Sequence, residues 1–223
     1  MIVVMADATK QAAVMQFRRT AVWHAHSAAS GGGRALKHWL EDRGSLTARL
    51  VARCRQFRVQ KLSQQLAGSL ADEFAALGLA RRTKVHQREV ILRCDGVPVI
   101  YGHTVVPLSA SHQQWPLFSS LGERSLGSTL FSDPLVQRGD LQFARLNAGH
   151  PLMQRIWREL PELRGIHSLP ARRSLFWRKG ACLMVTEVFL PAVLQLPPAG
   201  AVNTINREQQ AADVQSAVSL NQA

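Results

Sequence analysis

The chain has 223 residues, 46% of them hydrophobic, and its 27 Lys plus Arg against 15 Asp plus Glu give a formal net charge of +12. This length and composition suffice to bury one core, so we expect one domain with tails. No apolar run approaches the roughly 20 residues of a membrane span. The apolar patch before Asp7 is too short for a signal peptide, so we expect a cytoplasmic protein.

The positive charge raises the question of an anionic partner, which could be nucleic acid, a membrane surface or a small acid. The basic residues are scattered, and the sequence has no helix-turn-helix, zinc-finger or aromatic RNA-binding signature. This favours a small acidic substrate or general surface charge over nucleic acid. The three cysteines, Cys54, Cys94 and Cys182, lie far apart with no C-x-x-C pair. We therefore expect neither a disulfide framework nor a metal site.

Residues 1–34 have the composition of an extension, since they end in the Ser- and Gly-rich stretch 27–33, which is typical of a flexible linker. Within it, His24 and His26 form an H-x-H pair that could bind a metal. No third ligand lies nearby in the sequence, so a solvated tail motif is the favoured interpretation.

From Ala35 the pattern becomes helical, with an apolar stripe at Leu36, Trp39 and Leu40. Ser45 can then cap a second helix. Such a pair of helices usually packs on a core, but it could also form a flap over a pocket, with Leu46 pointing inward. A strand at 57–62 and a short helix at 69–79 are expected to follow.

Two long hairpins share one outline. The first, 88–107, turns at Asp95-Gly96, and the second, 173–191, turns at Lys179-Gly180. Each has an Arg eight residues before the turn glycine and a Pro eleven residues after it. Those residues are Arg88 and Arg172, and Pro107 and Pro191.

One charge stands on an otherwise apolar strand face in each hairpin. Arg88 shares its face with Val90 and Leu92, and Glu187 shares its face with Val185 and Phe189. A buried charge is costly unless it is paired or hydrogen-bonded. Two interpretations stay open. The residues form a structural ion pair or edge charges, or they line a closed pocket in which Arg88 binds an anion and Glu187 does acid, base or hydrogen-bonding work.

Between the hairpins, the stretch 121–131 predicts a tight turn and a short helix near Leu126, whose backbone N–H groups could bind a carboxylate. An ordinary loop-to-helix junction explains the same pattern. A strand at 140–146 and a helix at 150–166, interrupted at Pro161, should follow. Successive hairpins without strand–helix–strand repeats predict an α+β fold with one antiparallel sheet and helices on one face.

Four segments together resemble the chorismate lyase family: LEDRGSLTARL at 40–50, REVILRCDGVPVIYGHTVVP at 88–107, LGERSLGSTLF at 121–131 and RRSLFWRKGACLMVTEVFLP at 172–191. The resemblance implies one α+β domain at 35–195 whose antiparallel sheet encloses a buried ligand cavity, with neither metal nor organic cofactor. Residues 1–34 and 196–223 would be a flexible extension and tail. Like the stretch 150–166, they have no counterpart in compact family members.

By the same resemblance, the chain would eliminate pyruvate from chorismate to give 4-hydroxybenzoate, the first committed step of ubiquinone biosynthesis, and we expect a monomer. Arg88 would bind the ring carboxylate with the backbone N–H of Leu126, and Glu187 would hydrogen-bond the ring hydroxyl. Leu46, at a position that is often Met, would line the flap. His103 stands where the family can have an Arg, which leaves a role in binding the second carboxylate open.

Two rival classes remain. The same fold serves as the effector-sensing half of some transcriptional regulators, where it binds a small acid without turnover. Those proteins carry a DNA-reading winged helix in front, and residues 1–34 are too short and Gly-rich to form one. A nucleic-acid-binding protein would show steep salt dependence. We favour the enzyme.

Overall fold

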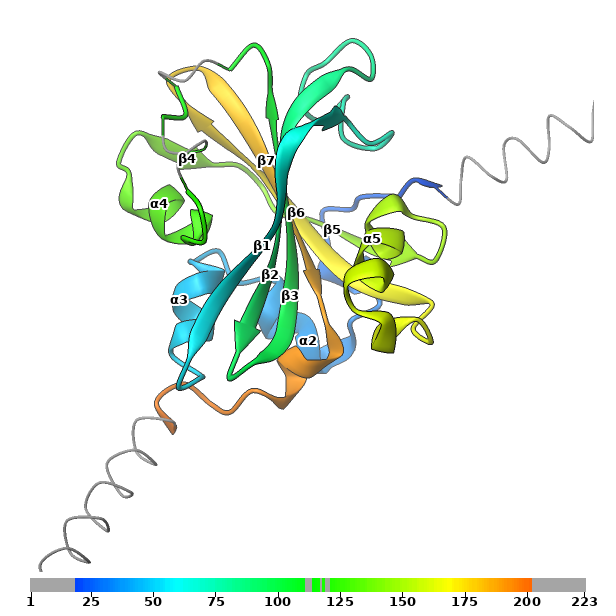
Figure 1. Ribbon diagram of the computed structural model, residues 1–223, viewed down its shortest axis with the longest axis vertical. Coiled ribbons are helices and arrows are strands. Elements are labelled where there is room, and N and C mark those ends of the chain that lie inside the picture. Colours follow the sequence, from blue (N-terminus) through cyan, green and yellow to red (C-terminus); the bar gives the residue numbers. More distant parts are fainter. Residues whose placement is uncertain (1–18, 111–113, 117, 119–120, 202–223) are drawn as a thin grey trace, which may run out of the picture.

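The computed structural model describes residues 19–110, 114–116, 118 and 121–201 (Figure 1). Its centre is a seven-stranded antiparallel sheet in the order β1-β2-β3-β7-β6-β4, with β5 also paired to β6. The strands are β1 Phe57–Gly68, β2 Lys84–Cys94, β3 Val97–Pro107, β4 Val136–Arg138, β5 Gln142–Asn147, β6 Ser168–Arg178 and β7 Ala181–Phe189. The predicted α+β fold with one antiparallel sheet is confirmed.

The helices are short. The α-helices are α2 Gly33–Leu40, α3 Leu46–Val51, α4 Leu126–Ser132 and α5 Pro151–Glu159, and the 3₁₀ turns are η1 Ser27–Ser30, η2 Pro161–Leu163 and η3 Pro191–Gln195. The Ser45 hydroxyl accepts the backbone N–H of Ala48 and so caps α3 as predicted. Among the residues that the structure describes, no helix is both long and apolar enough to cross a membrane.

Both predicted hairpin turns are present. Their central residues have positive φ, 50° and 82° at Asp95 and Gly96, and 49° and 76° at Lys179 and Gly180. Two consecutive positive φ angles are typical of a type I′ turn, whose twist matches that of the flanking strands. The hairpins join through β3 and β7, where Gly102 pairs with Glu187. This pairing makes β7 a central strand.

Helices cover both faces of the sheet. α2, α3 and α4 lie over the face that carries Val90 and Leu92. α5 packs through Met153 and Ile156 against the opposite face, next to Ile91, and Figure 1 shows it across the sheet from α3 and α4. The expectation that the helices gather on one face is therefore correct for α2 to α4 and wrong for α5.

The segment 69–79 is a series of turns and not the helix that its apolar pattern predicted. Glu73 is buried, and its carboxylate accepts the backbone N–H of Leu70. Leu77 is buried and Phe74 is half-buried. The tertiary contacts of Glu73 thus override a weak local helix preference.

The folded part begins before the expected boundary at residue 35. His24 exchanges two backbone hydrogen bonds with Phe143, of 2.9 and 2.8 Å, and Ser30 is fully buried. The Trp23 indole N–H donates to Asp72 at 2.9 Å. Residues 20–34 are therefore part of the domain and not a flexible linker. The rest of the predicted extension, 1–18, and the tail from 202 lie outside the described residues.

Candidate functional site

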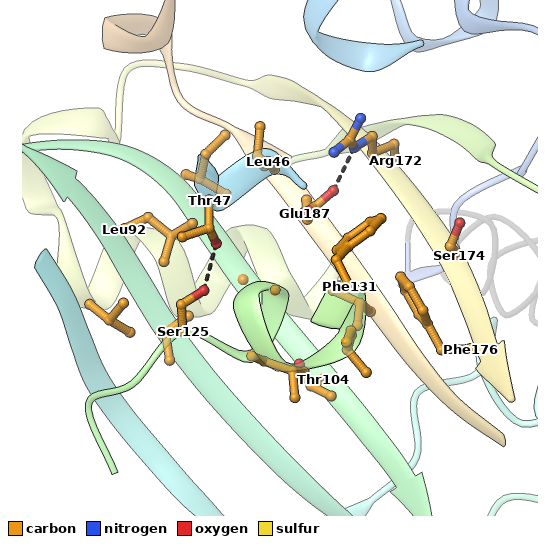
Figure 2. A pocket seen from close by; sticks show the side chains of 18 of the residues that line it. Leu46, Thr47, Leu92, Thr104, Ser125, Phe131, Arg172, Ser174, Phe176 and Glu187 are labelled. Atoms are coloured by element: carbon orange, nitrogen blue, oxygen red, sulfur yellow. Dashed lines mark hydrogen bonds and ion pairs between the residues drawn. The ribbon is translucent and has the colours of Figure 1, made fainter. Parts of the chain in front are cut away.

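A pocket lies between the sheet and the two helices α3 and α4 (Figure 2). The four residues expected at a site, Arg88, Glu187, Leu126 and Leu46, all line it. The strands β1, β2, β3, β4, β6 and β7 contribute most of the remaining wall, which includes Val59, Val90, Leu92, Gly102, Thr104, Arg138, Arg172, Ser174, Phe176 and Val185. The fold thus brings together residues that are up to 141 positions apart, from Leu46 to Glu187.

Arg88 is a buried cation, with 2% of its surface exposed. Its Nη2 donates to the backbone carbonyls of Gly122 at 3.1 Å and Arg124 at 2.9 Å, in the loop before α4. Among the described residues, its Nε has no hydrogen-bond partner. Burial lowers the pKa of Arg88. A guanidinium held by neutral carbonyls, with a donor still unused, is well suited to bind an anion.

Glu187 is paired with a neighbour on the adjacent strand. It accepts a hydrogen bond from Arg172 Nε at 2.5 Å, as Figure 2 shows. Arg172 is 1% exposed, and its Nη1 donates to three carbonyls at the end of α2, those of Trp39, Leu40 and Asp42. The pair therefore fixes the carboxylate and also ties α2 to the sheet.

The helices α3 and α4 meet over the pocket. The hydroxyls of Thr47 and Ser125 are 2.5 Å apart (Figure 2). At Gly127, an added Cβ would lie 2.8 Å from Thr47 Oγ1, so only glycine permits this approach. Leu46 is buried at the start of α3, and Leu126 is buried at the start of α4. The two helix starts thus form the cover of the pocket.

Arg138 also lines the pocket, although the sequence analysis did not single it out. It ends β4, a strand of three residues, which is too short to leave a periodic pattern. Its position beside Ser174 depends on the pairing of β4 with β6. The importance of Arg172 could have been inferred, because it precedes its turn by the same eight residues as Arg88.

Comparison with known proteins identifies the family. The sequence model of the family described as chorismate lyase matches residues 17–196. The chain belongs to the chorismate lyase family. It is 48% identical over 165 residues to a probable chorismate pyruvate-lyase of Cupriavidus pinatubonensis, covering 74% of this chain and 85% of that protein. It is 46% identical over 175 residues to one from Cupriavidus metallidurans, covering 78% of this chain and 82% of that protein.

Among solved structures, the chain is similar to the effector domain of PhnF from Mycobacterium smegmatis, with 15% identity and a TM-score of 0.49, over 66% of this chain and 89% of that one. This likeness is too distant to carry an argument about function.

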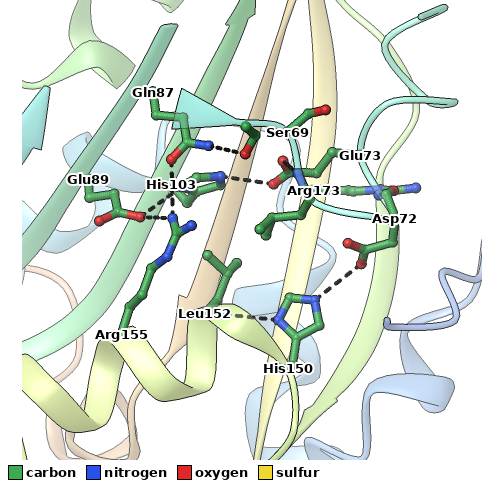
Figure 3. Close-up of polar contacts among 12 residues, drawn as sticks. Ser69, Asp72, Glu73, Gln87, Glu89, His103, His150, Leu152, Arg155 and Arg173 are labelled. Carbon is green, nitrogen blue, oxygen red and sulfur yellow. Dashed lines mark hydrogen bonds and ion pairs between the residues drawn. The ribbon is translucent and has the colours of Figure 1, made fainter. Parts of the chain in front are cut away.

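In this chorismate lyase family member, His103 does not line the pocket. It lies on the opposite face of the sheet, fully buried, with Nε2 2.8 Å from Glu73 and Nδ1 3.3 Å from Glu89 (Figure 3). Arg155 of α5 contacts the same oxygen of Glu89. Among the described residues, no cluster of His, Cys, Asp and Glu could hold a metal ion.

Proposed function

We propose that this chain is a chorismate pyruvate-lyase, which converts chorismate into 4-hydroxybenzoate and pyruvate as the first committed step of ubiquinone biosynthesis. We further propose that it acts in the cytoplasm as a monomer. The observation that carries the proposal is that Arg88 and Glu187 line one pocket without pairing with each other. A simple structural ion pair would have joined them.

The proposed reaction is an elimination that balances without an oxidant or reductant. The bond between ring C3 and the ether oxygen breaks, and its electrons leave with the enolpyruvate. The C4 hydrogen leaves as a proton, and the electrons of that bond complete the aromatic ring. Enolpyruvate takes up a proton to become pyruvate. Since aromatisation drives the reaction, the protein needs mainly to hold the reactive conformation and stabilise charge, for which we propose neither metal nor organic cofactor.

Each expected residue then has a role. Arg88 binds the ring carboxylate together with the backbone N–H of Leu126, and charge-assisted hydrogen bonds of this kind contribute roughly 1.5 to 3 kcal/mol each. Glu187 accepts a hydrogen bond from the ring hydroxyl. The hydrogen bond from Arg172 Nε holds the Glu187 carboxylate in place, which suits this orienting role.

The cover must move for the substrate to bind. The pocket volume is about 60 Å³, which is room for only a few water molecules. Chorismate, a ring acid with a second acidic side chain, needs more space. Leu46 and Thr47 on α3, and Leu126 on α4, line the pocket on the side away from the sheet. We propose that these two helix starts separate when substrate binds and when product leaves.

The test is to mix the purified protein with chorismate in the presence of a metal chelator and follow 4-hydroxybenzoate by absorbance and pyruvate by a coupled assay. Equal amounts of the two products are expected, with chorismate alone as the control for its spontaneous decay. Chorismate that binds but is not consumed would contradict the proposal and favour a sensing domain.

A further inference from the structure

The pocket carries more positive than negative charge. Three guanidinium groups line it, those of Arg88, Arg138 and Arg172, and among the described lining residues Glu187 is the only acidic one. Three cations and one anion leave a net charge of +2. Arg172 is already paired with Glu187, so among the described lining residues the two cations without an ion pair are Arg88 and Arg138.

Within the part of the chain that the structure describes, the hydrogen bonds of Arg138 all go to neutral groups, and the charge of Glu187 acts on it only from beyond ion-pair distance. Its Nε donates to the Ser174 hydroxyl at 3.1 Å, and its Nη1 donates to the carbonyl of Arg43 at 2.7 Å and, at 3.5 Å, to that of Gly44. The same residues offer no hydrogen-bond partner to Nη2 and no carboxylate partner to the side chain. Burial lowers the pKa of Arg138 to about 10, so the side chain stays a cation at neutral pH.

The guanidinium of Arg138 is also fixed in place. Its central carbon lies 5.4 Å from the Phe176 ring centroid and 5.5 Å from that of Phe131. Next to it, the backbone N–H of Gly139 donates to the Leu175 carbonyl at 2.8 Å, and an added Cβ at Gly139 would lie 2.5 Å from the Trp177 ring. The pairing of β4 with β6 and the contacts with these rings thus hold Arg138 in place.

Arg138 lies toward the Glu187 end of the pocket. Its partner Ser174 is on β6, two residues from Arg172 and on the same strand face, a separation of roughly 7 Å. In chorismate the enolpyruvyl ether is on the ring carbon next to the one that bears the hydroxyl. A substrate with its hydroxyl at Glu187 therefore places its second carboxylate near this end. His103 cannot supply the required charge because it lies on the other face of the sheet.

We propose that Arg138 binds the second carboxylate of the substrate, the one in the enolpyruvyl side chain, and holds the departing pyruvate as an anion. This inference rests on the proposed function for the identity of the substrate. The pocket is then a site for dianions, in which Arg88 and Arg138 each neutralise one carboxylate. During the elimination the negative charge moves to the enolpyruvate oxygen, and Arg138 is the cation next to the leaving group.

The experiment compares two stable aromatic acids by calorimetry, 3-(carboxymethoxy)-4-hydroxybenzoate and 4-hydroxy-3-methoxybenzoate, which differ in the second carboxylate. The proteins are the unmodified chain, Arg138→Gln, Arg138→Lys and a charge-matched control, Arg158→Gln, whose side chain is 68% exposed on the far face. We expect Arg138→Gln to weaken binding of the dianion on the order of 10- to 100-fold and that of the monoanion less than about 2-fold. Arg138→Lys should recover part of the loss, and Arg158→Gln should match the unmodified chain.

Equal effects of Arg138→Gln on both acids, or no binding of either acid by the unmodified chain, would overturn the inference. Arg138→Lys keeps the test decisive if Arg138→Gln does not fold. Turnover of chorismate by the unmodified chain is measured separately. If that turnover is absent while the two acids still bind, the proposed function fails. The role of Arg138 is then decided only by whether Arg138→Gln weakens binding of the dianion more than that of the monoanion.

Discussion

Glu187 forms its ion pair with Arg172, its direct neighbour across β6 and β7, although Arg88 lines the same pocket. The two arginines hold equivalent places in two similar hairpins, yet their surroundings differ. Arg172 is satisfied by one carboxylate and three carbonyls, whereas Arg88 binds two carbonyls and keeps Nε unused within the described residues. Arg172 therefore has a structural role in holding Glu187 and α2, and Arg88 is available to bind a ligand.

Arg88→Ala should lower kcat/KM for chorismate by about 30- to 1000-fold, which corresponds to about 2 to 4 kcal/mol of transition-state binding. The reason is the loss of the cation for the ring carboxylate. Steady-state kinetics measure the effect, and circular dichroism confirms the fold. Arg93→Ala is the matched control on the same strand, because Arg93 binds Gln60 and Gly96 outside the pocket. Near-normal turnover by folded Arg88→Ala would contradict the proposed mechanism.

Arg172→Met should be strongly destabilising, by about 3 to 5 kcal/mol, because it removes the partner of the Glu187 carboxylate and of three carbonyls at the end of α2. Urea denaturation measures this change. Glu187→Gln keeps a hydrogen-bond acceptor beside Arg172, so it should cost less stability while still reducing turnover. Equal stability losses in the two variants would show that Arg172 has no separate role in anchoring α2.

The buried group formed by His103, Glu73, Glu89 and Arg155 predicts a pH-dependent stability. Burial opposes protonation of His103, but the carboxylates of Glu73 and Glu89 outweigh it and raise the pKa to about 9. Because the pKa of His103 is higher in the folded than in the unfolded chain, its protonation stabilises the fold. The full contribution is present below the unfolded-state pKa of about 6.5, and it is lost as the pH rises toward 9. Thermal unfolding between pH 6 and 9.5 should show this decline, and His103→Gln should flatten it. An unchanged slope in the variant would refute the assignment.

The lowered pKa of Glu89 predicts that the protein loses stability at acid pH. Burial opposes its ionisation, but His103 and then Arg155 lower the pKa to about 2. A lowered pKa contributes stability above the unfolded value of about 4.3, and the contribution is lost as the pH falls toward 2. Glu89→Gln should therefore narrow the difference in unfolding free energy between pH 5 and pH 3. Glu159→Gln, at an exposed ion pair with Arg158, is the control and should leave that difference unchanged.

Thr47→Val should loosen the cover by removing the hydrogen bond between α3 and α4. One neutral hydrogen bond of about 0.5 to 1.5 kcal/mol predicts a rise in the dissociation rate of 4-hydroxybenzoate of about 2- to 10-fold. Stopped-flow displacement measures this rate. Ser128→Ala is the control, since among the described residues the Ser128 hydroxyl binds only the carbonyl of Ser125, the residue before α4. A slower release in Thr47→Val would argue against separation of the two helices.

The hairpins were predictable because their signals are local. A glycine turn and the alternation of side chains are sufficient to place Arg88 and Glu187 on apolar faces. Arg138 was not predictable in this way, because its contact with Ser174 depends on which strand β4 pairs with. The turns of 69–79 were missed for the same reason, since Glu73 is drawn to His103 by a contact across 30 residues.

The close contact between Gly139 and the Trp177 ring lies outside the pocket, on a residue that is 39% exposed. The ring nevertheless requires a glycine at 139, directly after β4, and β4 ends at the guanidinium proposed to hold the leaving group. A larger residue at 139 would therefore have to displace either the Trp177 ring or the end of β4 that carries Arg138. The position of the proposed leaving-group cation thus depends on two residues that do not line the pocket.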